Sequence, residues 1–428
     1  MNENNWQTMW SDDQIRMLLL EQSRAFWESD TGIRREKLAD LERVAHLPHA
    51  VVISGLRRVG KSTLLAQMAH QLGRESFYYV NFEDERFIGF QPEDANHLYQ
   101  LLVEFSGDRK VFLIDEIQNV PGWEHFVRRF MEMGFKFYIT GSNASLLSSE
   151  LGSLLTGRHI PIELFPFSFK EYLRFSGHTP VNPEQMSTAE KGMLNSDLAA
   201  YIEAGGIPIA LRYPEIPLLR NLYDDVLYRD IGSRYRIESV GALRELAFFL
   251  ISNPACPVSF NKLKAQLHLG SVNTVKSYIE YLENSWLIFT THQYDFSVKR
   301  QQIAPKKIYA IDSGLCNAVG FGFSPNSGKL LENLVYLSLR QKFKEIYYFG
   351  TAGGHEIDFY IPENWQLIQV CQDMKHPSTR ERELRAIGEA VQTIKVKSAL
   401  ILTNVNENDF TIQNIPVQVR STAEWLLY

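Results

Sequence analysis

Cysteine is scarce in this chain, and its scarcity excludes two kinds of site. The 428 residues contain three cysteines, Cys256, Cys316 and Cys371, which are far apart and have no histidine at metal-ligand spacing. Disulfide frameworks and zinc sites need several cysteines, or cysteines with histidines, at short and regular intervals. We therefore expect neither of them.

Long apolar runs are missing as well. The longest, near residues 246–251, is far shorter than the ~20 residues that a membrane-spanning helix needs. Residues 1–13 are polar and acidic and lack the basic and apolar regions of a secretory signal. These absences predict a cytoplasmic protein without a membrane partner.

The whole chain has no excess of positive charge, but one segment does. The formal net charge is −6, so the molecule as a whole is not a polycation that would bind nucleic acid. Between residues 241 and 310, eight Lys or Arg stand against four Asp or Glu, a net charge of +4. A contact with nucleic acid is therefore expected in this segment.

From residue 50 to residue 165, short β-rich runs alternate with helical stretches. The runs are residues 51–54, 77–82, 111–115, 135–140 and 160–164. This alternation predicts an α/β fold with a parallel sheet that is covered by helices on both faces. A helix over residues 13–27 is expected to pack against this core, which together with it makes a first domain of residues 1–165.

The remaining chain shows three further patterns. Residues 166–237 are helical, with a break at Gly205-Gly206-Ile207-Pro208, and are expected to form a small lid. Residues 238–302 have the order of helices, turn and β-rich run that is typical of a winged helix. Residues 303–428 mix strands with helices and are expected to form a separate α/β domain.

A phosphate-binding loop is predicted between the first β-rich run and the helix that follows it. Its residues are Gly55, Leu56, Arg57, Arg58, Val59, Gly60, Lys61 and Ser62, with Thr63 next in the helix. Glycines let the backbone wrap a phosphate, and N–H groups at a helix N-terminus attract the anion. We expect Lys61 to meet the β- and γ-phosphates of ATP and Ser62 to bind Mg²⁺. The alternative is an ordinary strand-to-helix turn.

Two acidic residues follow the apolar run of residues 111–114. Asp115 and Glu116 therefore stand at the carboxyl end of a buried strand, where α/β sheets bind their ligands. Asp115 is expected to hold the magnesium shell, and Glu116 to orient or deprotonate the attacking water. The alternative is the start of a solvated loop, and the phosphate loop upstream favours the functional interpretation.

Two more residues are candidates for the same chemistry. Asn143, with Ser142 beside it, follows a β-rich run and could contact the γ-phosphate or the water, although it could equally cap the next helix. Arg158 could stabilise transition-state charge in a neighbouring subunit of an oligomer. A plain surface arginine is the alternative.

Several stretches together resemble a bacterial and archaeal family of AAA-type ATPases. They are GLRRVGKSTLL, FLIDEIQNVPGWE, ITGSNASLL, LTGRHIPIELFPFSFKEYL, GGIPIAL, DDVLYRDI, GKLLENLVYL and HEIDFYI, and they span nearly the whole chain. The resemblance implies an AAA+ core of the P-loop type, a winged helix and a C-terminal domain similar to PD-(D/E)XK nucleases. It also implies ATP and Mg²⁺ as cofactors.

Two details refine this resemblance. Gly206-Ile207-Pro208 looks like the Gly-x-Pro element of signal-transduction ATPases, in which Pro208 would contact the nucleotide; a helix-breaking loop is the alternative. The nuclease-like domain has Asp358 and Glu332, but its expected Glu-x-Lys triplet reads Gln369-Val370-Cys371. A lysine elsewhere, such as Lys375, could stand in for the missing one. We therefore expect a domain that binds without cutting.

Two functions remain open. The first is an oligomeric ATPase that remodels or moves along DNA, including branched or damaged DNA. Its candidate phosphate contacts are Lys276, Lys299, Arg300, Lys306 and Lys307. The second is a nucleotide-dependent switch that senses a protein or a ligand, in which the winged helix is part of the lid and the basic run is a solvated loop.

Overall fold

The chain folds into two compact units, Met1–Phe165 and Pro166–Tyr428. The computed structural model describes residues 6–144, 155, 157–179, 182–237, 239–320, 327–374 and 376–428. No helix within these ranges is long and apolar enough to cross a membrane.

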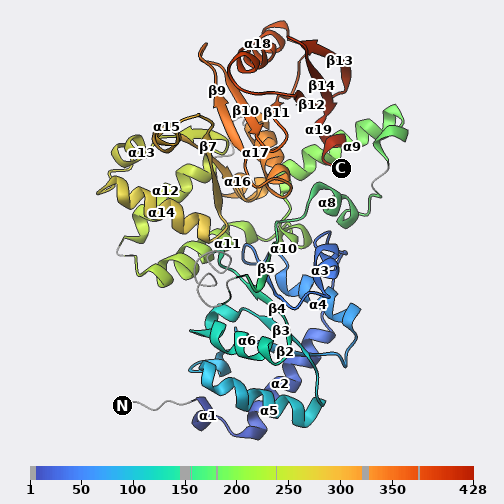
Figure 1. Cartoon of the computed structure of the whole chain (residues 1–428), viewed down its shortest axis with the longest axis vertical. Coiled ribbons are helices and arrows are strands. Elements are labelled where there is room, and N and C mark those ends of the chain that lie inside the picture. Colours follow the sequence, from blue (N-terminus) through green and yellow to red (C-terminus); the bar gives the residue numbers. More distant parts are fainter. Residues whose placement is uncertain are drawn as a thin grey trace. The chain divides into compact units, whose positions relative to one another are not determined.

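The first unit is built around a parallel sheet (Figure 1). Its strands, in spatial order, are β2 (Phe77–Asn81), β3 (Val111–Asp115), β4 (Lys136–Gly141), β1 (Ala50–Ser54) and β5 (His159–Glu163). Every neighbouring pair runs in parallel, so the carboxyl ends of all strands share one edge. The predicted α/β fold and parallel sheet are confirmed, and each predicted strand agrees with the observed one to within one residue at either end.

Helices bury both faces of this sheet. They are α1 (Trp6–Met9), α2 (Asp12–Trp27), α3 (Leu38–Val44), α4 (Lys61–Leu72), α5 (Ala95–Ser106) and α6 (Trp123–Glu132). All five residues of β1 are buried, which requires cover on both sides. Val52, Tyr78 and Ile114 point to one face and join a core with α5 and α6, while α4 packs on β3 and β4.

Serine and acidic residues start several helices of the chain. Ser11 caps α2 through a capping box with Gln14, which fixes the beginning of the predicted N-terminal helix. In the second unit, α8 (Phe169–Phe175) and α9 (Thr188–Ala204) begin with the same device. Helices α10 (Pro208–Arg212) and α11 (Leu218–Asp225), a π-helical turn (Val226–Ser233) and α12 (Val240–Ser252) follow.

A nine-stranded sheet runs through the rest of the second unit. Its spatial order is β13 (Glu407–Ile412), β14 (Ile415–Ser421), β12 (Ser398–Thr403), β11 (Gln366–Val370), β10 (Glu356–Ile361), β9 (Tyr347–Gly350), β7 (Ile288–Gln293), β8 (Lys306–Ala310) and β6 (Cys256–Val258). The helices along this part are α13 (Phe260–Gln266), α14 (Val272–Asn284), α15 (Val298–Ile303), α16 (Ser313–Val319), α17 (Ser327–Arg340), α18 (Pro377–Thr393) and α19 (Thr422–Trp425).

The sheet joins two segments that the sequence pattern separates. Strand β7 pairs with β8 on one side in antiparallel fashion and with β9 on the other side in parallel fashion. A boundary between residues 302 and 303 would therefore cut a continuous sheet. Local patterns predict strands, but they contain no information on which distant strands share their hydrogen bonds.

Candidate functional site

The phosphate loop lies at the carboxyl edge of the first sheet, between β1 and α4. Gly60 is the residue before α4 and has a φ of 98°, a conformation that side chains disfavour. Arg58 also has a positive φ, of 62°, so the loop turns sharply before the helix begins. This backbone points the first N–H groups of a twelve-residue helix toward the sheet edge.

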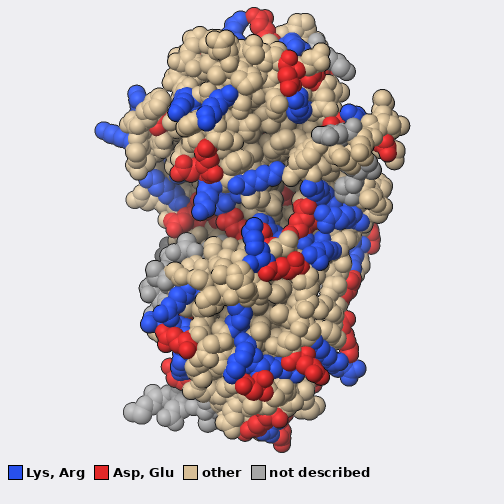
Figure 2. Space-filling view, turned by 45° about the vertical axis from the view of Figure 1, so that its right-hand side comes forward, with Lys and Arg blue, Asp and Glu red and all other residues tan. Residues whose placement is uncertain are grey.

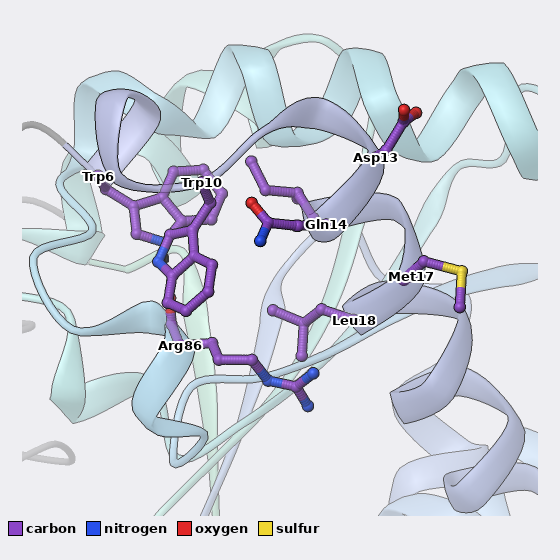
Figure 3. Close-up of a pocket in the computed structure, with 8 residues that line it drawn as sticks. Trp6, Trp10, Asp13, Gln14, Met17, Leu18 and Arg86 are labelled. Atoms are coloured by element: carbon purple, nitrogen blue, oxygen red, sulfur yellow. Dashed lines mark hydrogen bonds between the residues drawn. The ribbon is translucent and has the colours of Figure 1, made fainter.

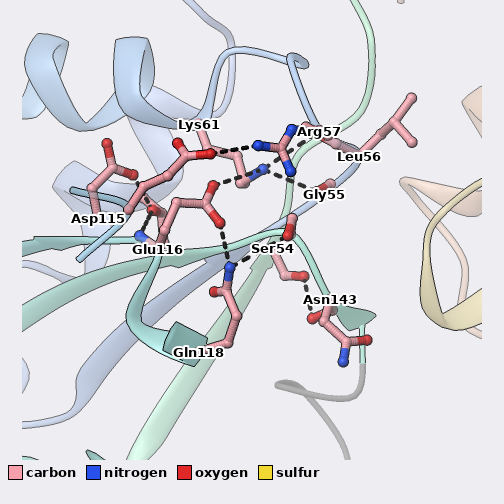
Figure 4. A network of polar contacts seen from close by, with 12 residues as sticks. Ser54, Gly55, Leu56, Arg57, Lys61, Asp115, Glu116, Gln118 and Asn143 are labelled. Atoms are coloured by element: carbon pink, nitrogen blue, oxygen red, sulfur yellow. Dashed lines mark hydrogen bonds and ion pairs between the residues drawn. The ribbon is translucent and has the colours of Figure 1, made fainter. Parts of the chain in front are cut away.

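Lys61 is held with its ammonium inside the loop (Figure 4). Its side chain is 4% exposed, and Nζ donates to the carbonyl oxygens of Gly55 and Leu56, each at 3.3 Å. The same Nζ lies 3.5 Å from Oε1 of Glu116. The loop thus holds a buried cation, which is the group that the β- and γ-phosphates of a nucleotide need.

Asp115 ends β3 and is fully surrounded by polar partners. The hydroxyl of Thr140 donates to Oδ1, the Tyr79 hydroxyl donates to Oδ2 at 3.3 Å, and the Ser62 hydroxyl bonds the same carboxylate. Burial, helped by repulsion from Glu116, raises the pKa of the Asp115 carboxyl. A hydroxyl and a carboxylate oxygen brought together in this way are the hard donors that Mg²⁺ prefers, so Ser62 and Asp115 fit a magnesium ion.

Glu116 is turned toward Lys61 by a strained backbone. Its φ is 52°, and its N–H donates to Oγ1 of Thr140 at 3.1 Å. Burial opposes ionisation of the carboxyl, but Lys61, a hydrogen bond from Gln118 and the charge of Arg57 outweigh it and lower the pKa of Glu116. The carboxylate is therefore ionised at neutral pH, as a base that takes or orients a water proton must be.

Gln118 is a site residue that the sequence pattern did not reveal. Its Nε2 donates to Oε2 of Glu116 and lies 3.4 Å from Oγ of Ser142. The amide thus orients the carboxylate against β4 (Figure 4). The only signal in the sequence was its position two residues after the acid, which by itself indicates nothing.

Asn143 and Ser142 are buried at the same edge of the sheet. The Ser54 hydroxyl donates to the backbone carbonyl of Asn143 at 2.9 Å, which anchors the end of β4 to the end of β1. In Figure 4 the side-chain amide of Asn143 points away from Lys61 and Glu116. Ser142, through Gln118, is the one of the two that connects to the acid, and a direct contact of Asn143 with phosphate stays a prediction.

The other residues of the phosphate loop differ in how far they are buried. Val59 is buried, Arg58 is exposed, and Thr63 is half-buried in the first turn of α4. Arg57 forms an ion pair with Glu83, next to the end of β2.

Arg35 braces the phosphate loop and was not predicted. Its side chain is 3% exposed, and its guanidinium donates to the carbonyl oxygens of Val59 at 2.9 Å and of Phe165 at 2.7 Å. Gln67 on α4 accepts from the Arg35 backbone N–H at 3.0 Å and donates to the carbonyls of Thr31 and Ile33. The segment before α3 is thereby bound to both sides of the loop.

Arg158 lies at the opposite edge of the sheet from the phosphate loop. It precedes β5, and its carbonyl accepts from the N–H of Ala50, the first residue of β1. The length of β1, about 16 Å for five residues, separates the two edges. The side chain is half-exposed and paired with Glu132 at 3.0 Å. Arg158 therefore cannot act on the loop of its own chain, and a role in a neighbouring subunit stays a prediction.

The Gly205-Gly206 break is a close packing junction within the second unit. A Cβ at Gly205 would lie 2.2 Å from Oδ1 of Asp312, and one at Gly206 would lie 2.5 Å from the carbonyl oxygen of Phe167. Asp312 accepts from the Gly206 N–H at 2.6 Å, and burial raises the pKa of its carboxyl to about 6. Pro208 opens α10 as its first residue. Close packing therefore explains why glycine stands at both positions. A contact of Pro208 with a nucleotide stays a prediction.

A second polar site lies in the nine-stranded sheet, and it contradicts one predicted DNA contact. Lys307 is 1% exposed, and its Nζ lies 2.8 Å from Glu332, 2.7 Å from Glu356 and 3.5 Å from Asp358. Burial opposes its charge, but the three carboxylates outweigh this and raise the pKa of Lys307. The prediction that Lys307 contacts DNA is wrong, because β8 carries it into the interior.

This carboxylate cluster borders a polar cavity of about 610 Å³. Burial raises the pKa of both Glu332 and Asp358. Gln369 is fully engaged, since its oxygen accepts from the Asp358 N–H at 3.1 Å and its nitrogen donates to Glu383 at 2.6 Å. Within the described ranges, no three His, Cys, Asp or Glu side chains are arranged to hold a metal ion. Lys375 lies outside the described residues.

The remaining basic candidates are on the surface or near it. Lys276 on α14 and Lys299 and Arg300 on α15 are exposed. Lys306 is half-buried at the start of β8, with its ammonium 5.4 Å from the ring of Phe260. Basic and acidic side chains are interspersed over the face in Figure 2, so any polyanion must be met by a local group of charges.

Another cavity, of about 330 Å³, lies against α1 and α2 in the first unit. It is lined mainly by Trp6, Trp10, Met17 and Leu18, and Figure 3 shows the side chain of Arg86 beside them. That guanidinium is already paired with Asp84 and with Glu21, at 2.9 and 3.0 Å. The cavity therefore has the features of an apolar surface depression and none of a catalytic site.

Comparisons with known proteins agree with this geometry. A family model described as an AAA domain matches residues 48–173, which include the loop and both acids, and a domain of unknown function matches residues 195–327. An uncharacterized protein of Methanocaldococcus jannaschii is 35% identical over 380 residues, covering 86% of this chain and 84% of that protein. One of Haemophilus influenzae is 32% identical over 334 residues, covering 74% and 81%.

Likeness to solved structures is weak by comparison. The match to the Orc1 protein of Aeropyrum pernix, solved in complex with DNA, covers 69% of this chain and 95% of that chain, at 14% identity and a TM-score of 0.31. A score of this size carries no inference about ligand or partner.

We predict that Arg35→Met destabilises the first unit and weakens nucleotide binding, because two buried carbonyls lose a charged donor. Hydrogen bonds from charged groups contribute about 1.5–3 kcal/mol, and a loss in that range is expected in urea unfolding. Arg35→Lys should recover part of it, since one ammonium cannot span both carbonyls. Arg34→Lys, at an exposed neighbour, is the matched control. An unfolding midpoint for Arg35→Met equal to that of the control would refute the bracing role.

Proposed function

This chain belongs to the same family as these proteins of M. jannaschii and H. influenzae, and we propose that it is a DNA-associated, oligomeric AAA+ ATPase. The observation that carries the proposal is the convergence of Lys61, Asp115 and Glu116 at one sheet edge, with Lys61 only 3.5 Å from Glu116. A buried cation, an oxygen site for magnesium and an ionised carboxylate are the groups that phosphoryl transfer to water requires.

Each residue has one task in this proposal. The loop N–H groups and Lys61 bind the phosphates of ATP, and Ser62 with Asp115 hold Mg²⁺, which when bound offsets the charge on the phosphates. Glu116 orients a water or takes its proton, and Gln118 keeps the Glu116 carboxylate in place. Arg35 keeps the loop carbonyl of Val59 aligned with the end of β5.

Association with DNA rests on the second unit. There α12, β6, α13, α14 and β7 follow one another, then α15 and β8, which supports a winged helix with β6, β8 and β7 as its small antiparallel sheet. Lys276, Lys299 and Arg300 are exposed on its helices, and Lys306 is half-buried at the start of β8. These four residues, without Lys307, are the proposed phosphate contacts.

The nucleotide-dependent switch remains the second candidate. Its sequence support was the Gly-x-Pro element, whose glycines now have a packing role against Asp312 and Phe167. ATP turnover measured with single-stranded, duplex and forked DNA separates the two functions. Strong stimulation favours the DNA-associated ATPase, and turnover that ignores all three favours the switch.

We expect Lys61→Ala to abolish ATP binding or hydrolysis. Glu116→Gln should keep ATP bound and slow turnover by about 10²- to 10⁴-fold, because this change removes only the base. Equilibrium binding of a fluorescent ATP analogue and steady-state phosphate release measure the two effects. Asp108→Asn, at an exposed acid that precedes β3 and so lies at the opposite end of this strand from Asp115, is the control. Normal turnover in Lys61→Ala would overturn the ATPase assignment.

Arg158→Ala should retain ATP and lose hydrolysis, because an arginine supplied by a neighbouring subunit acts on transition-state charge. Mixing this variant with Lys61→Ala should restore part of the activity, since a mixed oligomer contains sites with an intact loop and an intact arginine. Sedimentation verifies that mixed oligomers form. Mixed oligomers without any recovered turnover would remove Arg158 from the mechanism.

We also expect no metal-dependent cleavage of DNA by the C-terminal domain. Lys307 is paired with Glu332, Glu356 and Asp358, and Gln369 is bound to Glu383. Among the described residues, no three acidic, His or Cys side chains are arranged to hold the metal ion that cleavage requires. Plasmid, linear and branched DNA incubated with the protein in Mg²⁺ or Mn²⁺, with and without ATP, provide the assay. Cleavage that disappears in Asp358→Ala would prove this expectation wrong.

A further inference from the structure

The segment between β7 and β8 carries an unusual concentration of exposed apolar side chains. Phe296 is 71% exposed, Val298 is 67% exposed and Ile303 is 73% exposed, all within residues 295–304, which we call the tip segment. Single exposed apolar side chains are ordinary on a protein surface, but a group of them in one short segment indicates a contact site.

The tip segment is a rigid structure. One carboxylate oxygen of Asp295 accepts from the Ser297 N–H at 2.8 Å and from Nε of Arg300 at 3.0 Å, and the Asp295 carbonyl accepts from Gln301 at 2.8 Å. The Phe296 ring meets the ring of Tyr294 edge-on, with centroids 5.6 Å apart. The apolar groups are thus presented on a fixed backbone, so that binding orders few additional groups.

Tyr294 connects the exposed ring to the core of the unit. Its own ring lies 4.7 Å from that of Tyr360 on β10, in an edge-on contact. One side of Phe296 is therefore supported by the half-buried Tyr294, which packs on the buried Tyr360, while most of the Phe296 surface faces solvent. A supported, exposed aromatic ring is suited to stack on a flat partner.

The charges around the tip segment favour an anionic partner. Lys299 and Arg300 are exposed on α15, and the acid of the segment, Asp295, is paired with Arg300. Lys306 follows on β8, and its contact with Phe260 brings the start of α13, with the exposed Lys262, to the same side. Cations surrounding an aromatic ring match a strand that offers phosphates and bases alternately.

We propose that the tip segment binds unpaired nucleotides, with the ring of Phe296 stacked on a base and Lys299 on a flanking phosphate. Stacking requires a base whose face is open, so single strands and forks are the partners and intact duplex is not. Helix α15 has six residues, too few for the amphipathic helices that lie along membranes. The proposal rests on the DNA association proposed above and assigns to it a strand type and a contact residue.

The test uses the full-length protein and fluorescein-labelled DNA as a single strand, a fork and a blunt duplex, followed by anisotropy at several salt concentrations. Phe296→Ala should weaken binding to the single strand and the fork by about tenfold and leave the salt slope unchanged, because it removes stacking and no phosphate contact. Lys299→Ala should reduce that slope by about 0.7 on a single strand. Phe296→Trp should retain the affinity.

Controls separate this effect from damage to the fold. Met193→Ala removes another side chain of similar exposure, 63%, on α9 of the same unit, and should change nothing. Thermal unfolding and DNA-free ATP turnover of Phe296→Ala should equal those of the unchanged protein, because Phe296 is mostly exposed and belongs to neither motif of the proposed ATPase site. A 2-aminopurine base in the single strand should change its emission with the unchanged protein and with Phe296→Trp, but much less with Phe296→Ala.

Each opposing result has a distinct meaning. No binding to any of the three DNAs would overturn both the DNA association and the role of the tip segment. Binding that Phe296→Ala leaves intact, or weakens equally for duplex and single strand, would overturn the stacking proposal alone. Loss of self-association in Phe296→Ala with unchanged DNA binding would assign the tip segment to a protein contact and also overturn it.

Discussion

Parallel pairing of β1 with β4 and of β4 with β3 is the constraint on which the candidate site depends. It brings the phosphate loop after β1, Asp115 at the end of β3 and Ser142 after β4 to one edge, although they are far apart in the sequence. The hydroxyls of Ser54 and Thr140 then bond across neighbouring strand ends. An antiparallel arrangement of the same strands would divide these groups between two edges.

Two buried lysines of this molecule, Lys61 and Lys307, have different partners. In the first unit, Lys61 faces one carboxylate and two backbone carbonyls. In the second unit, Lys307 is enclosed by three carboxylates. A buried ion pair stabilises a structure only while every partner is present.

The second unit joins elements that the sequence pattern assigns to separate domains. Its nine-stranded sheet joins the small β6, β8 and β7 sheet to the C-terminal strands through the β7–β9 pair. The tip segment is therefore based on the same sheet that holds the carboxylate cluster, and Tyr294 packs on Tyr360 of that sheet.

The sequence by itself determined the α/β class, the strands of the first sheet and the identities of Lys61, Asp115 and Glu116, because period, turn residues and a glycine loop are local signals. The tertiary structure alone decided the rest. Arg35 and Gln118 bind groups through contacts that no spacing encodes. Lys307 was predicted to be a surface cation because it stands in a basic run, residues 297–307, that contains no acid. Alternation along β8 sends Lys307 to three carboxylates that come from α17 and β10, and only the folded chain brings those elements to it.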